Sequence, residues 1–91
     1  MNARSWSFRF GLPVVLWLAH AAAPAHADFA TAVADYRAGR YEAAAGEFER
    51  LAWLGLAPAQ SGLAVALANG HGVPRNPGKA AAWAGIAAQG G

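Results

Sequence analysis

The sequence predicts an all-α protein of about four short helices that pair into helical hairpins. Alanine supplies much of the 56% hydrophobic content, and an alanine-rich chain with few β-branched residues favours helix over strand. Apolar side chains recur at intervals of three and four residues, which places them on one face of a helix. Glycines follow these apolar stretches, as expected where helices end. With 91 residues, the chain has room for one small domain at most.

The first 27 residues have the layout of a secretory signal peptide. Their start is positively charged and carries no acid, and residues 11–19 form an apolar run. Ala25 and Ala27 then form a small-x-small site in front of Asp28. We therefore expect cleavage after Ala27 and a periplasmic or secreted mature protein.

The alternative is that residues 1–27 remain attached as a membrane anchor. The apolar stretch from Gly11 to Ala23 is shorter than the roughly 20 residues that a transmembrane helix needs. His20 also interrupts it. We therefore prefer cleavage, and expect membrane contact only through the signal segment before it is removed.

The charge balance argues against nucleic-acid binding. The formal net charge is +2, from 7 basic and 5 acidic residues, but Arg4 and Arg9 lie in the predicted signal peptide. Subtracting these 2 from 7 leaves as many basic as acidic residues, so no basic patch for phosphate groups remains. The chain has no cysteine, so the mature protein must be held together by packing without disulfides.

Residues 28–56 predict a first helical hairpin. Its first helix starts at Asp28, which can act as the N-cap. Gly39 ends this helix, and a second helix runs from there to Gly55. The apolar positions with helical spacing are Phe29, Val33 and Tyr36 in the first helix and Tyr41, Ala44, Ala45, Phe48, Leu51 and Ala52 in the second.

Residues 57–91 predict a second hairpin with a longer connection. The loop at 70–75 precedes Asn76 and Pro77, an N-cap residue followed by proline at the first helical position. The apolar positions expected to pack are Ala59, Leu63 and Leu67 in the first helix of this pair and Ala80, Trp83, Ala87 and Ala88 in the second.

Two motifs carry a resemblance to known helical repeats. The pattern Gly39-x-Tyr41-x-x-Ala44-x-x-x-Phe48-x-x-Leu51 resembles about half of a tetratricopeptide repeat. Residues 57–91 are similar to one whole Sel-one-like repeat, a class that replaces the tight turn with a Gly-x-Gly-Val loop. The residues that carry this likeness are Ala57-Pro58-Ala59-Gln60, Leu63, Gly70-x-Gly72-Val73 and Lys79-Ala80-x-x-Trp83-x-x-x-Ala87-Ala88-x-x-Gly91.

The resemblance implies a fragment of an α/α solenoid whose general role is to bind other proteins. The chain departs from the Sel-one-like pattern at Ala64, Leu67, Asn76 and Ala84. An aromatic residue is usual at the positions of Leu67 and Ala84, so these departures thin the expected core and put the family's ligand contacts there in doubt.

The predicted mature chain offers no cluster of residues that points to catalysis. A metal site needs several converging ligands, and His71 has no histidine or acid within four residues. We therefore interpret His71 as a solvated loop residue. Ser61 has no activating base and orienting partner at a recognisable spacing, and the acids are interpreted as solvated faces. We predict a binding protein and not an enzyme, with no cofactor and no metal.

Large side chains on the helices are the candidates for repeat core or partner contact. From their helical spacing, Trp53 and Trp83 are interpreted as core, and the alternative is that one of them lines an exposed groove. The full set of candidates is Tyr36, Tyr41, Trp53, Leu67, Trp83 and Ile86.

Two hairpins are fewer than the three repeats that a solenoid usually needs to bury its apolar faces. We expect one of two explanations: the chain pairs with a protein partner or with itself, or it is a shortened repeat protein without independent activity. In a third, less favoured explanation, Trp83 and Ile86 fold back onto Trp53 and Phe48 and close a four-helix cluster. The leading hypothesis is an exported scaffold or adaptor for protein–protein contacts in the bacterial cell envelope.

Overall fold

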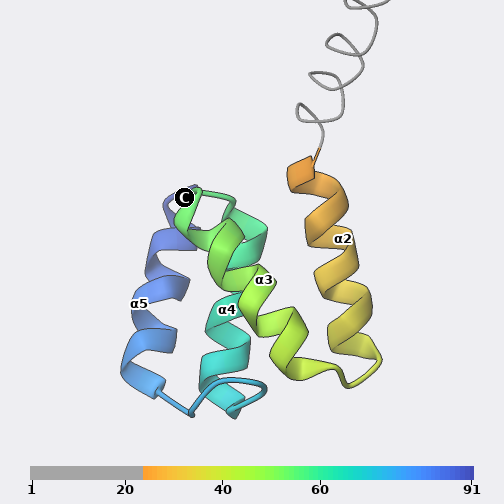
Figure 1. The fold of residues 1–91 in the computed structure, drawn as a ribbon. Coiled ribbons are helices and arrows are strands. Elements are labelled where there is room, and N and C mark those ends of the chain that lie inside the picture. The colour runs from red at the N-terminus through yellow and green to blue at the C-terminus, as the bar shows by residue number, and fades with distance from the viewer. Residues whose placement is uncertain (1–23) are drawn as a thin grey trace, which may run out of the picture.

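A computed structural model describes residues 24–91, which form four α-helices and no strand (Figure 1). The all-α prediction is confirmed for this part of the chain. Of the predicted signal peptide, residues 1–23 lie outside the described residues. Between residues 24 and 91, no helix is both long and apolar enough to cross a bilayer. The helices are α2 (Pro24–Arg37), α3 (Tyr41–Trp53), α4 (Ala57–Asn69) and α5 (Pro77–Ala88).

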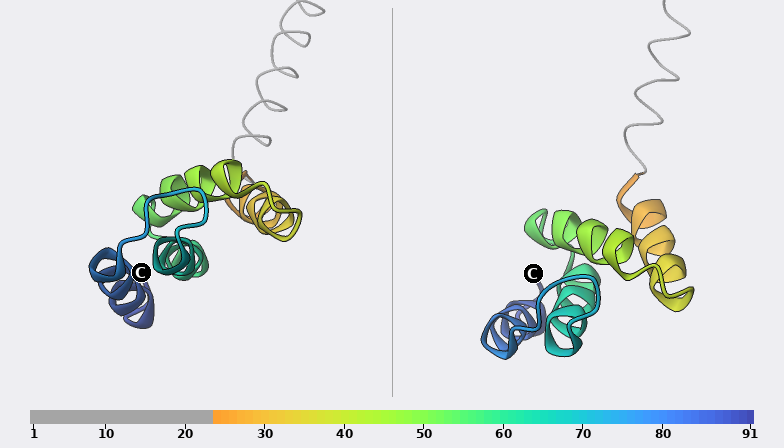
Figure 2. Two further views of the ribbon diagram at one scale, coloured as in Figure 1. Left: turned by 90° about the horizontal axis from the view of Figure 1, so that it is seen from below. Right: turned by 60° about the horizontal axis from the view of Figure 1, so that its bottom comes forward.

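Successive helices run antiparallel and pack in an open row. The packed pairs are α2 with α3, α3 with α4, and α4 with α5. Figure 2 shows α2 and α5 at opposite ends of this row. The four helices therefore do not close into a bundle within residues 24–91. The third explanation is wrong about a closed four-helix cluster, but the contact of Trp83 with Trp53 that it expected is present.

The turns that end α2 and α3 are built in the same way. Gly39 and Gly55 have φ angles of 82° and 91°, a left-handed conformation that glycine adopts without a steric penalty. After α2, the backbone N–H of Arg40 donates to the carbonyl of Asp35 at 2.8 Å. After α3, that of Leu56 donates to Leu51 at 3.1 Å. These are the bonds of the Schellman motif, so both glycines end their helices as predicted.

The start of α2 differs from the prediction. The helix begins at Pro24, so Asp28 lies inside it and does not cap it. Instead, the Asp28 carboxylate accepts a hydrogen bond of 2.7 Å from Nη2 of Arg50 on α3. The Arg50 Nε also donates to Glu47 at 2.9 Å. A contact between two helices has therefore replaced the local capping role that the sequence indicated.

Small side chains let the helices approach closely around one large ring. Phe48 is buried, and its ring lies against Gly62 of α4, where a Cβ atom would come within 3.0 Å of it. Ala44, Leu51 and Ala59 are completely buried beside it. The predicted core positions on α3 and α4 are thus confirmed, apart from two on α3: Tyr41 is only half-buried and Trp53 is exposed. Ala88 is exposed and its prediction as core is wrong, because α5 ends the row and packs mainly on α4.

The connection between α4 and α5 positions the last helix. The Asn76 side chain accepts a hydrogen bond of 3.0 Å from the backbone N–H of Lys79, and Pro77 begins α5. The predicted N-cap is therefore confirmed. The backbone N–H of Asn76 donates to the carbonyl of Leu67 at 2.8 Å, which ties the end of the loop to α4.

Candidate functional site

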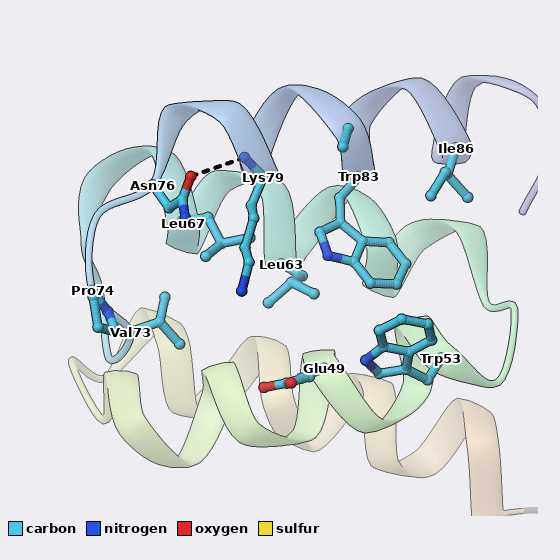
Figure 3. Close-up of a pocket in the computed structure, with 11 residues that line it drawn as sticks. Glu49, Trp53, Leu63, Leu67, Val73, Pro74, Asn76, Lys79, Trp83 and Ile86 are labelled. Carbon is cyan, nitrogen blue, oxygen red and sulfur yellow. Dashed lines mark hydrogen bonds between the residues drawn. The ribbon is translucent and has the colours of Figure 1, made fainter.

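A groove lies between α3 and α5, with α4 beneath it (Figure 3). Leu63 and Leu67 of α4 form its floor, and the indoles of Trp53 and Trp83 face one another from its two walls. Its volume is about 520 Å³. The residues that line it are Glu49, Trp53, Leu63, Leu67, Val73, Pro74, Asn76, Lys79, Ala82, Trp83 and Ile86.

The two tryptophans meet edge to face. Their ring centroids are 5.0 Å apart and their planes are inclined by 87°. Such pairs are favoured by the ring quadrupoles. Trp53 is nevertheless 74% exposed, whereas Trp83 is half-buried against the core. The interpretation of Trp53 as core is therefore wrong, and it lines an exposed groove. Trp53 lies one turn after the exposed Glu49, and not on the face of α3 that buries Phe48 and Ala52.

Four of the six predicted contact residues are brought together by this groove. Trp53 comes from α3, Leu67 from α4, and Trp83 and Ile86 from α5. Leu67 is buried in the floor and Ile86 is 40% exposed. The groove therefore combines residues that the sequence analysis proposed separately for packing and for partner contact.

The other two predicted residues, Tyr36 and Tyr41, lie together in a second cluster with His71. The Tyr36 hydroxyl forms a hydrogen bond of 2.6 Å with Nδ1 of His71. The Tyr41 ring stacks on the imidazole, with centroids 4.2 Å apart and planes inclined by 9°. The interpretation of His71 as a solvated loop residue is therefore wrong. Its loop returns to the α2–α3 turn, where Gly72 lies against the backbone of Tyr41. Apart from the two glycines around His71, nothing in the local sequence indicates this contact.

Charged residues border the groove on opposite walls. Glu49 lies one helical turn before Trp53 on α3, and Lys79 lies one turn before Trp83 on α5. Asn76, the remaining polar residue of the lining, has its side-chain oxygen engaged in capping α5. Within residues 24–91, histidines and acids form no group of three or more that could hold a metal ion.

The ion pairs of Arg50 and Arg40 lie outside the lining of the groove. Arg50 contacts both Glu47 and Asp28. The hydrogen bond to Glu47 is the main cause that raises the pKa of Arg50 above its ordinary value, so its guanidinium stays charged throughout the range in which proteins are studied. Arg40 pairs with Asp35 at 2.8 Å across the α2–α3 turn.

The predicted cleavage residues lie in the first turns of α2. Ala25, Ala27 and Asp28 all belong to this helix. Cleavage after Ala27 stays a prediction.

No family model, no curated protein and no solved structure matches the chain. The function is therefore inferred from the residues and their geometry.

Proposed function

We propose that this chain is an exported helical-repeat protein of the bacterial cell envelope that works as a scaffold or adaptor, binding protein through the groove of Trp53 and Trp83. The observation that carries the proposal is Trp53, an indole that is 74% exposed beside an apolar groove. Tryptophan is enriched among the residues that contribute most to protein–protein binding. A contiguous exposed apolar surface marks an interaction site more often than an isolated exposed side chain does.

The arrangement of the groove supports a protein ligand. A protein interface combines an apolar centre, where the binding energy is concentrated, with a polar rim. Here the centre consists of Trp53, Trp83 and Ile86, and Glu49 and Lys79 stand at the rim. The resemblance to Sel-one-like and tetratricopeptide repeats supports the same role, and the signal-peptide layout of residues 1–27 supports export.

The groove lining does not favour an enzyme. Catalysis by proton or acyl transfer needs a nucleophile or acid within hydrogen-bond reach of its partner. Glu49 and Lys79 stand on opposite walls, and Asn76 is committed to its helix cap. We therefore include the absence of enzymatic activity in the proposal.

Site-specific photocrosslinking tests the proposed function in the cell. The full chain is expressed with a photoreactive phenylalanine analogue at position 53, and a matched chain carries it at Ala43, which is exposed on the same helix outside the groove. We expect a discrete protein adduct from position 53 and none from position 43. The same adducts from both positions, or none from either, would reject the groove as a protein-binding surface.

The second candidate function is that of a membrane-tethered accessory protein that keeps residues 1–27. One observation favours it: α2 begins at Pro24, so its first turn crosses the predicted cleavage point after Ala27. Intact-mass spectrometry of native protein separates the two. A mass that begins at Asp28 supports export with cleavage, and a mass that begins at Met1 supports the tether.

A further inference from the structure

We infer that the groove is covered by a second copy of this chain, related to the first by a twofold axis that runs along the groove. The inference rests on the proposed function in taking the groove as a protein-binding surface. It goes further in naming the occupant, and it depends on a repeated pattern of charge and indole on the two walls.

The two walls carry the same pattern with opposite charge. Because α4 runs antiparallel to both α3 and α5, these two helices point in the same direction (Figure 1). Glu49 precedes Trp53 by four residues on α3, and Lys79 precedes Trp83 by four residues on α5. Residues four apart lie on the same face of a helix, one turn from each other. Each wall therefore presents a charge and then an indole, in the same order.

The Trp53–Trp83 contact brings the two patterns together. The two rings are 5.0 Å apart, and each wall carries its charge one turn before its indole. Figure 3 shows the Lys79 side chain pointing across the groove toward the wall that carries Glu49. The groove thus presents an acid on one wall and a base on the other, each one turn before its indole.

A twofold axis along the groove makes this surface complementary to itself. Such an axis keeps the helix direction and exchanges the walls, so α3 of one copy lies over α5 of the other. Glu49 of each copy then faces Lys79 of its partner, and Trp53 of each copy faces Trp83 of its partner. An isologous interface requires this self-complementarity of one surface patch. An axis across the groove would place α3 over α3 and would not pair these charges.

The shape of the groove also favours a second copy over an inserted helix. The floor is already covered, because Leu63 and Leu67 are 3% and 7% exposed. The apolar surface that remains accessible is on the walls, where Trp53 is 74% and Ile86 is 40% exposed. A facing copy covers both walls at once, whereas a helix seated on the floor would find little uncovered surface there.

The proposed dimer is tested by its dependence on protein concentration. The test uses protein purified from the envelope of cells that express the full chain, studied by sedimentation velocity over a range of concentrations. The wild type is expected to pass from monomer to dimer as concentration rises. Trp53→Ala is expected to raise the dissociation constant about tenfold or more, and Ala43→Ser, outside the groove, is expected to leave it unchanged.

Charge reversal identifies the pairing. Glu49→Lys and Lys79→Glu each place like charges opposite one another in the dimer, so each variant alone is expected to be monomeric. An equimolar mixture of the two is expected to form a heterodimer, because every facing pair is then opposite in charge. The double variant, with both reversals in one chain, is expected to dimerise like the wild type. Both side chains are exposed, and far-ultraviolet circular dichroism checks that each variant is folded.

Each contrary outcome overturns the inference. These outcomes are a wild type that stays monomeric at every concentration, single variants that dimerise like the wild type, or a mixture that stays monomeric. A monomeric protein whose crosslinker at position 53 still traps a different protein would retain the proposed function and reject the twofold pairing. A dimer that crosslinks only to itself would support the pairing and reject an adaptor role for the groove.

Discussion

Tyr36 and His71, 35 residues apart in the chain, are joined by a hydrogen bond of 2.6 Å between the tyrosine hydroxyl and Nδ1 of the imidazole. Tyr41 stacks on the other side of this contact, against the face of the His71 ring. Tyr36 belongs to the first hairpin and His71 to the loop of the second. This bond is therefore a long-range tie between the first hairpin and the loop of the second.

We expect Tyr36→Phe to lower the free energy of unfolding by about 1 kcal/mol, the usual net contribution of a hydrogen bond. His71→Ala should cost more, because it also removes the stack on Tyr41, which adds about 0.5–1.5 kcal/mol. In urea denaturation the double variant should be less destabilised than the sum of the single ones. Ser61→Ala removes an exposed hydroxyl as a control and should change little. Additive effects would show that the two side chains act independently.

Gly72→Ala should destabilise the protein strongly. Gly72 has a φ of 79°, and a Cβ atom there would collide with the carbonyl oxygen of Tyr41. A side chain in this backbone conformation costs about 1–3 kcal/mol, and the collision adds to it. The matched control is Gly46→Ala in α3, where a Cβ atom meets nothing within 4 Å.

Because alanine favours a helix interior over glycine, the Gly46 variant should gain about 0.5–1 kcal/mol. Thermal denaturation followed by circular dichroism measures both changes. A Gly72 variant as stable as the wild type would show that the loop does not pack on the α2–α3 turn.

Gln60→Met should stabilise the protein. Gln60 is 2% exposed, and its Oε1 is buried without a hydrogen-bond partner among residues 24–91. Its Nε2 donates to the carbonyl of Ala52 at 3.1 Å, but that carbonyl also accepts from the backbone of Gly55 at 3.0 Å. Methionine of similar shape therefore removes an unsatisfied oxygen without leaving the carbonyl unpaired. We expect a gain of about 1 kcal/mol in denaturant unfolding. Gln89→Met, at an exposed position, is the control and should change stability little.

Arg50→Ala should lower the melting temperature at low salt, and the difference should shrink at high salt. Arg50 bridges Asp28 of α2 and Glu47 of α3, and half of its side chain is solvent-exposed. Exposed ion pairs are screened as the Debye length falls from about 10 Å at 0.1 M salt to about 3 Å at 1 M. Arg37→Ala, an exposed change at the end of α2, serves for comparison. A difference that persists at about 1 M salt would assign the effect to packing of the arginine stem.

Much of the candidate site could be predicted from the sequence as a set of residues, but not as a surface. Trp53, Leu67, Trp83 and Ile86 were identified from size and helical spacing, and the structure brings them to one groove. Spacing did not show that Trp53 is exposed, because that depends on which face of α3 the other helices cover. Glu49 and Trp53 on one wall match Lys79 and Trp83 on the other. This match became visible only once the structure showed that α3 and α5 run in the same direction.

The sequence by itself determined the helices: their apolar faces, the ends of α2 and α3 at Gly39 and Gly55, and the start of α5 after Asn76. These features depend on hydrogen bonds and side chains within about five residues of each other, so the local sequence is sufficient. Only the tertiary structure decided that Asp28 pairs with Arg50 and that His71 joins Tyr36. Those contacts connect residues 22 and 35 positions apart, and they form only when the helices have packed and the loop has folded back.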